Sequence, residues 1–237
     1  MKKVKLSKNI LSLGLVLGVV LSMVWVSSIK SQGYYNNNQK WTQFYTKYKK
    51  QPYKRISLYG KIVKGTNKPV LTIVEFIDFL CPYCKIAGSK ISSFAKKYKR
   101  QVKMAYVMYP LDKSCNKGLS RQIHGGACLA AYGAHCANQY GKFSQYHDNL
   151  FYRQEGYGGR FTQKNLDLIL AVLGLKKGRF MSCVNSYATK KKVAQSIALG
   201  NKLGVTGTPT VFINGRKTPE VPDEFMLSRL LQEKLKR

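Results

Sequence analysis

Acidic residues are scarce in this chain. Its 237 residues include 10 Asp and Glu against 41 Lys and Arg, which gives a formal net charge of +31 at pH 7. Such an imbalance predicts attraction to anionic surfaces or acidic partners. Nucleic acid is one such partner, but the sequence contains no nucleic-acid-binding motif. We favour the interpretation of a basic, solvated face close to an anionic membrane surface.

Histidine and cysteine are also few, with three and six residues respectively. None of the histidines, His124, His135 and His147, has a nearby serine–acid arrangement that would suggest hydrolysis, so we expect them on helix surfaces or in packing. Six cysteines are too few for a small disulfide-dense scaffold, yet more than a cytosolic enzyme usually needs. The segment 156–159 (Gly-Tyr-Gly-Gly) is too weak a pattern to indicate a phosphate-binding loop.

Residues 1–30 carry five lysines and no acidic residue, and the run from Ile10 to Ile29 is apolar and uncharged. This pattern predicts an export signal with its basic end held in the cytoplasm. Val26-Ser27-Ser28 is a weak cleavage site, and the run is long enough to span a bilayer, so a cleaved signal peptide and an uncleaved anchor both remain open. Either way, we expect the rest of the chain outside the cytoplasm, in the bacterial periplasm, where structural disulfides persist.

A polar and aromatic segment follows, from residue 31 to residue 55. Trp41, Phe44, Tyr45 and Tyr48 recur at the spacing of one helix face. We expect either a tether whose helix lies on its own domain or a segment that joins two copies into a homodimer.

Residues 56–237 alternate strand and helix patterns, which predicts one α/β domain. A strand, a helix and a strand in succession imply a parallel βαβ unit, and a helical block of about residues 115–181 interrupts the pattern. The expected strands are 56–63, 69–79, 102–109 and 210–215, and the expected helices are 84–100, 118–174 with a break at 156–159, 182–203 and 222–236.

The sequence Cys81-Pro82-Tyr83-Cys84 follows an apolar strand pattern and precedes a helical one. A helix start offers free N–H groups and partial positive charge, and both favour the thiolate that attacks disulfides. We expect Cys81 to lie exposed as the attacking group and Cys84 to be shielded as the resolving group. A structural disulfide is one alternative. Half of a zinc site is another, and its missing ligands would come from Cys115, His124, Cys128, His135 and Cys136.

Glu75 is the first acidic residue of the chain, and it interrupts the apolar strand. Its apolar neighbours on both sides favour burial over an edge position in water. Burial should raise the pKa of the carboxyl group, which could then exchange a proton with Cys84. Asp78 is a weaker candidate, expected to be a helix-entry cap or a turn residue.

The segment 204–215 places Pro209 just before a short apolar strand. A proline at such a position is a candidate for a cis peptide bond. That bond would turn the backbone of Thr208 outward, where it could pair with a substrate strand beside Cys81. Alone, Pro209 would indicate an ordinary turn, but together with Cys81 and Cys84 it indicates a thiol-exchange site.

These segments resemble the DsbA-like branch of the thioredoxin superfamily over about residues 69–235. The segments that carry the resemblance are 74–84 and 205–210, with 109–112 and 141–148 as further matches. The resemblance implies an α/β thioredoxin fold with an inserted helical block and reoxidation by a quinone-linked membrane partner. It also implies catalytic roles for Cys81, Cys84 and Glu75, and substrate contacts for Thr208, Pro209, Pro82 and Tyr83.

Two residues depart from the strongly oxidising members of that family. Similar proteins of that kind carry His where this chain has Tyr83, and tyrosine cannot supply a positive charge to a neighbouring thiolate. We therefore expect a reduction potential less oxidising than the roughly −120 mV of DsbA. Thr208 before the proline resembles isomerases and reductases of the wider superfamily, so the direction of net electron flow stays open.

The remaining four cysteines permit three pairings. Cys128 and Cys136 are two turns apart on one expected helix, too far to bond each other, which removes one pairing. Of the two left, we prefer Cys115–Cys128 with Cys136–Cys183 as structural disulfides. Cys115 lies in a loop just before the helix, and some similar family members carry a second bridge at corresponding positions.

We therefore predict an exported thiol–disulfide oxidoreductase that introduces disulfides into unfolded or reduced exported proteins, with no bound cofactor and no metal. A disulfide isomerase or reductase of the same compartment is the alternative within this chemistry. A membrane-tethered chaperone is the alternative from a different class.

Overall fold

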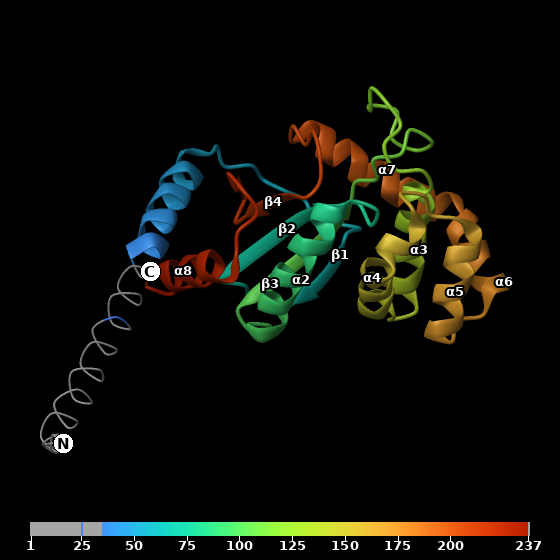
Figure 1. Ribbon diagram of the computed structural model, residues 1–237, viewed down its shortest axis with the longest axis horizontal. Helices are drawn as coiled ribbons and strands as arrows, with labels where there is room; N and C mark the ends of the chain where they lie inside the picture. Colours follow the sequence, from blue (N-terminus) through green and yellow to red (C-terminus); the bar gives the residue numbers. More distant parts are fainter. Residues whose placement is uncertain (1–24, 26–34, 237) are drawn as a thin grey trace, which may run out of the picture. The chain divides into compact units, whose positions relative to one another are not determined.

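The computed structural model describes residue 25 and residues 35–236 (Figure 1). The expected signal peptide or anchor in residues 1–30 lies outside the described residues, apart from Trp25. The chain divides into two compact units between Thr46 and Lys47, inside a helix of residues 35–50. That helix falls where the aromatic spacing predicted one, and the Trp41 and Tyr45 rings stack with their centroids 4.8 Å apart. Over the described part of the chain, no helix has the length and apolarity needed to cross a membrane.

A five-stranded mixed sheet forms the centre of the larger unit, in the order β1-β3-β2-β4-β5. Its central strands β2 and β3 run parallel, as expected for a βαβ unit, whereas β1 and β4 pair with them in antiparallel fashion. Both central strands are apolar and almost entirely buried, as strands covered on both faces usually are. The strands are β1 Ile62–Gly65, β2 Leu71–Ile77, β3 Val102–Met108, β4 Thr210–Ile213 and β5 Arg216–Lys217.

One helix, α2, connects β2 to β3, and another, α8, follows β5. Five α-helices and one 3₁₀ helix form the block between β3 and β4. Figure 1 shows α3, α4, α5 and α6 grouped to one side of the sheet, with α2 lying along its strands. The helices are α2 Pro82–Lys97, α3 Ala127–Gln139, α4 Phe143–Tyr152, the 3₁₀ helix η1 Gln154–Tyr157, α5 Gln163–Leu173, α6 Lys177–Asn185, α7 Tyr187–Lys202 and α8 Glu224–Leu235.

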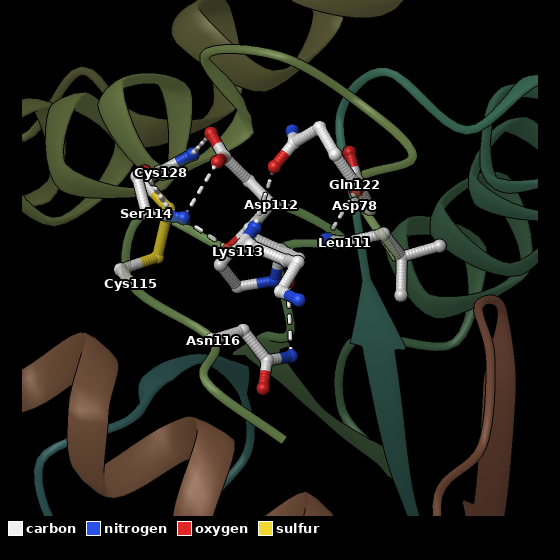
Figure 2. Close-up of a disulfide and its surroundings, with 10 residues drawn as sticks. Asp78, Leu111, Asp112, Lys113, Ser114, Cys115, Asn116, Gln122 and Cys128 are labelled. Atoms are coloured by element: carbon white, nitrogen blue, oxygen red, sulfur yellow. Dashed lines mark hydrogen bonds between the residues drawn. A yellow bond between two sulfur atoms is a disulfide. The ribbon is translucent and has the colours of Figure 1, made fainter. Parts of the chain in front are cut away.

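The helical block begins later than predicted, because residues 113–126 form a loop rather than a helix. Figure 2 shows how Asp112 holds this loop. Its carboxylate accepts hydrogen bonds from the backbone N–H of Ser114 at 3.0 Å and of Cys128 at 3.3 Å. The Asp112 side chain therefore accepts hydrogen bonds from backbone N–H groups of both the turn and the first turn of α3. The helix α3 begins only at Ala127.

Two further boundaries differ from the prediction. The expected helix 182–203 is two helices, because Ser186 is extended (ψ 144°) and its hydroxyl accepts from the Thr189 N–H as the N-cap of α7. The expected strand 56–63 starts only at Ile62, because Gly60 takes a left-handed conformation with φ 71° in a turn. The predicted helix at 84–100 starts earlier, at Pro82, the favoured first helical position for proline.

Two disulfides hold the helical block. One joins Cys115 to Cys128 and ties the 113–126 loop to α3, as Figure 2 shows. The other joins Cys136 of α3 to Cys183 of α6, 47 residues further along the chain. Cys81 and Cys84 are the free cysteines of the described residues.

Candidate redox site

The two free cysteines lie where β2 leads into α2. Cys81 is the N-cap of α2, with extended backbone and no side-chain cap, and Pro82 occupies the first turn. The backbone N–H groups of Tyr83 and Cys84 contribute to the lowered pKa of Cys81, and the Cys84 N–H donates to the Cys81 carbonyl oxygen at 3.0 Å. The first cysteine thus lies at the start of the helix, where the partial positive charge favours a thiolate.

Cys81 is buried, with 4% of its surface exposed, and the expectation that it would lie exposed is wrong. Its thiol turns away from solvent and donates a hydrogen bond to the carbonyl oxygen of Thr208 at 3.2 Å. Cys84 is fully buried, as expected for a shielded thiol. The Cys81 sulfur thus lies against the Thr208 backbone rather than in open solvent.

The two thiols have opposite pKa shifts. Hydrogen bonds from the Cys84 thiol, then from Thr208 and the helix N–H groups, lower the pKa of Cys81 to about 6 although burial opposes this. Burial, followed by the Cys81 and Glu75 charges, raises the pKa of Cys84. At neutral pH the pair thus carries one thiolate, on Cys81, and one thiol, on Cys84.

Glu75 lies on β2 and is completely buried, as its apolar neighbours indicated. Neither carboxyl oxygen has a hydrogen-bond partner within the described residues. Burial raises the pKa of Glu75 to about 8, and its charge contributes to the raised pKa of Cys84. A protonated carboxylic acid is therefore present near the resolving thiol at neutral pH.

The Thr208–Pro209 peptide bond is cis in the structure. Tyr83, Thr208 and Pro209 line one groove of about 300 Å³ between the start of α2 and this loop. Pro82 lines a second, larger groove of about 610 Å³ on the other side of Cys81. Tyr83 itself is 72% exposed. The four residues expected to contact substrate thus line these two grooves, and their contact with substrate stays a prediction.

Gln154, which the sequence did not single out, ties the helical block to this site. Its side-chain amide donates to the backbone oxygens of Phe79 at 2.8 Å and Cys81 at 2.9 Å. The Phe79 ring packs against Phe151 of α4, with ring centroids 5.4 Å apart. The inserted block therefore positions the loop that carries Cys81, and no local sequence pattern could show this long-range contact.

His124 and Asp78 also belong to the site. His124 lies in the loop before α3, so the expectation that it is a helix-surface or packing residue is wrong. Its Nδ1 lies 2.9 Å from Asp78 Oδ2, and its ring lines the larger groove with Leu80 and Pro82. Asp78 is a turn residue, as expected, because its carboxylate accepts from the Leu80 N–H at 2.7 Å. His135 and His147 are buried packing residues, each 4% exposed.

The cysteines considered as zinc ligands are paired in the two disulfides. Among the residues that the structure describes, no three His, Cys, Asp or Glu side chains gather as metal ligands.

A mixed sheet that carries a Cys-x-x-Cys pair at a helix start, beside a cis-proline loop, defines a thioredoxin-fold protein with a dithiol site. The chain belongs to the family of DSBA-like thioredoxin domains, whose model matches residues 72–232. The predicted fold class, an α/β thioredoxin fold with an inserted helical block, is confirmed.

Similar proteins fall into two groups. Disulfide bond formation protein D of Bacillus subtilis is 24% identical over 188 residues, which cover 76% of this chain and 79% of that protein. The Na(+)/H(+) antiporter NhaA 3 of Salinispora tropica is 28% identical over 155 residues, which cover 65% of this chain but only 22% of the antiporter. This chain thus matches about a fifth of the antiporter's length.

Among solved structures, oxidised BdbD from Bacillus subtilis is similar, with a TM-score of 0.65 and 22% identity. The match covers 79% of this chain and 99% of that one. At this identity the likeness shows the fold alone.

Proposed function

We propose that this chain is an exported thiol–disulfide oxidoreductase that donates the Cys81–Cys84 disulfide to reduced exported proteins. The observation that carries the proposal is the opposite shift of the two thiol pKa values, with Cys81 at about 6. A stabilised Cys81 thiolate favours the reduced dithiol form. The oxidised form therefore gives up its disulfide more readily than an unperturbed pair would.

The reaction begins when a substrate thiolate attacks the Cys81 sulfur of the oxidised chain. The Cys81–Cys84 bond breaks, its electron pair goes to Cys84, and a mixed disulfide forms between substrate and Cys81. Glu75 is protonated and close enough to influence Cys84, so it supplies the proton that the Cys84 thiolate takes up. A second substrate thiolate then attacks the substrate sulfur of the mixed disulfide. Cys81 leaves as a thiolate, the substrate is oxidised by two electrons, and the chain is reduced.

Substrate is proposed to bind beside Thr208 and Pro209, in the groove that Tyr83 also lines, and Pro82 lines the second groove. The Thr208 carbonyl oxygen, which holds the Cys81 thiol in the reduced chain, would be freed for a substrate backbone N–H once Cys81 has no proton. Exposed Tyr83 offers an apolar surface that suits unfolded polypeptides.

The same proposal includes export from the cytoplasm, a membrane redox partner and contact with an anionic membrane. The basic start and apolar run of residues 1–30 support a signal peptide or an anchor, and the two disulfides of the helical block suit an oxidising compartment. Repeated turnover needs an electron acceptor, for which we propose a quinone-linked membrane protein. The surplus of basic residues supports contact with an anionic membrane, and residues 31–55 would be the tether or the dimerisation segment.

One observation favours a second candidate, a disulfide isomerase or reductase. The Cys81 pKa of about 6 lies between the roughly 3.5 of DsbA and the roughly 7 of thioredoxin. Refolding assays separate the two functions. A donor reactivates a reduced, unfolded substrate when supplied oxidised, whereas an isomerase reactivates a scrambled, fully oxidised substrate when supplied reduced. Activity on the scrambled substrate alone would reject the donor function, and a Cys81→Ser, Cys84→Ser chain is the control for both assays.

A further inference from the structure

Asp78 brings a buried carboxylate to the loop that carries Cys81. It is 2% exposed, it precedes Cys81 by three residues, and its backbone oxygen accepts from the Cys81 N–H at 3.1 Å. A negative charge so close to a thiolate opposes its formation. A positive charge that compensates Asp78 would favour the thiolate, and Tyr83 cannot provide one.

His124 is placed to provide that charge. Its Nδ1 meets Asp78 Oδ2 at 2.9 Å, and the same oxygen accepts from the Leu111 N–H at 2.7 Å, so the carboxylate is held from two sides. The backbone of His124 is also held in place, because its N–H donates to the Leu111 carbonyl oxygen at 2.9 Å. Figure 2 shows the Leu111 N–H directed at Asp78. The orientation of the ring is thus set by hydrogen bonds rather than by solvent.

The other charged groups along this groove do not replace His124. Lys85 and Glu155 line it too, but they bond to each other at 2.6 Å with side chains 35% and 87% exposed, so water screens their charges. The His124 and Asp78 side chains are 15% and 0% exposed, so their charges are screened less. The hydrogen bond to Asp78, and then the charges of Asp78 and Cys81, raise the pKa of His124 against the effect of burial. Because an electrostatic interaction is mutual, a protonated His124 favours the Cys81 thiolate, as a smaller effect than the hydrogen bonds from Cys84 and Thr208.

We propose that His124, oriented by Asp78, is the cation that stabilises the Cys81 thiolate in this chain, in place of a charged residue between the two cysteines. Asp78 is then a positioning residue and His124 an electrostatic one, contributed by the loop that leads into α3. The inference rests on Cys81 being the reactive thiol of the proposed function. It adds a residue outside the Cys81–Cys84 segment that contributes to how oxidising the pair is.

Reciprocal titration tests the coupling in the full chain. The chain has only three histidines, so their ring protons can be followed by NMR against pH and assigned with His124→Gln. Oxidation of Cys81–Cys84 removes the thiolate, and the His124 midpoint should then fall by about 0.5–1 pH unit, less than the 1–3 units typical of a directly adjacent charge. His135 and His147 are internal controls that should not move. Equal His124 midpoints in the oxidised and reduced chains would overturn the proposal.

The converse measurement follows the Cys81 thiolate by its ultraviolet absorbance. His124→Gln should raise the Cys81 midpoint by about the same 0.5–1 pH unit, which makes the disulfide roughly three- to tenfold less oxidising. Lys113→Gln removes one positive charge from the exposed part of the same loop and should leave the midpoint unchanged. His124→Lys keeps a cation and should restore it. A wild-type midpoint in a folded His124→Gln chain, or equal shifts in His124→Gln and Lys113→Gln, would reject the proposal. These titrations need no protein substrate, so their outcome is independent of the refolding assays. The role of His124 can therefore be rejected while the disulfide-donor function stands, and the donor function can be rejected while the role of His124 stands.

Discussion

The Cys81 thiol donates a hydrogen bond to the Thr208 carbonyl oxygen at 3.2 Å, across 127 positions of the sequence. The same threonine has a buried hydroxyl with no hydrogen-bond partner within the described residues. That hydroxyl contributes to the lowered pKa of Cys81, since it can donate to the thiolate. One residue of the cis-proline loop therefore accepts from the thiol and donates to the thiolate.

Thr208→Val should separate these two contacts, because it removes the hydroxyl and keeps the backbone carbonyl. We expect the midpoint of the Cys81 thiolate titration to rise by several tenths of a pH unit, since one of the groups that favour the thiolate is lost. Stability should change by less than about 1 kcal/mol, because no protein hydrogen bond is broken. Thr206→Val, a substitution two residues earlier on the same loop, is the matched control. An unchanged midpoint in Thr208→Val would exclude this role for the hydroxyl.

Cys84 should set the pKa of Cys81, because its hydrogen bond is the largest cause of the lowered value. In the reduced wild-type chain, alkylation of Cys81 should show a midpoint near pH 6, while Cys84 stays unreactive through neutral pH. Cys84→Ala removes the donor and should move the Cys81 midpoint upward, whereas Cys84→Ser keeps a hydroxyl donor and should move it less. Quantitative mass spectrometry of the alkylated peptides gives both midpoints. Equal midpoints in the two variants would contradict this assignment.

Glu75 should make the reduced chain less stable as the pH rises. Its pKa is about 8 in the folded chain against 4.5 unperturbed, so folding favours the protonated carboxyl group. The stability that this preference provides is full below pH 4.5 and is lost progressively as the pH rises to about 8. Glu75→Gln should therefore match the wild type near pH 4 and exceed it at pH 7 by on the order of 3 kcal/mol. Urea unfolding at both pH values measures the difference.

The same Glu75→Gln substitution should slow thiol exchange although it stabilises the fold. The amide cannot supply or accept the Cys84 proton, so displacement of Cys84 as the mixed disulfide forms should slow by about 100-fold, the lower end of what general acid–base catalysis contributes. Rapid-mixing kinetics with a reduced peptide measures this step. A variant that is both more stable and as fast as the wild type would exclude the proton transfer.

The two disulfides of the helical block should contribute unequally to stability. Cys115–Cys128 closes a separation of 13 residues and Cys136–Cys183 one of 47. In the chain-entropy model, removal should cost about 3 kcal/mol for the first and about 4 kcal/mol for the second. Paired Cys→Ala variants, unfolded in urea, measure both costs. A smaller loss for Cys136–Cys183 than for Cys115–Cys128 would contradict the ranking.

The parts of the site that the sequence predicted are those with a local pattern. Glu75 stands out as a carboxyl group in an apolar strand, and the segment 81–84 joins a strand pattern to a helical one. Thr208 and Pro209 precede an apolar strand in the same recognisable way. In each case the neighbouring residues already determine the burial or the turn.

The residues that escaped prediction act through contacts between distant segments. Gln154 reaches the Cys81 backbone across 73 positions, and His124 reaches Asp78 across 46. The residues that flank Gln154 and His124 in the sequence form no pattern that would predict these contacts. The exposure of Cys81 was mispredicted for the same reason, because Thr208, which accepts its hydrogen bond, comes from the far end of the domain.

The reduction potential of Cys81–Cys84 tests the central claim most directly. The chain is equilibrated in glutathione buffers of known potential, and the fraction oxidised is read from the alkylated 81–84 peptide, so the two structural disulfides do not interfere. A disulfide donor with a Cys81 pKa near 6 should have a potential between the roughly −120 mV of DsbA and the roughly −270 mV of thioredoxin. A value at or below about −270 mV would contradict the proposal that this chain donates disulfides.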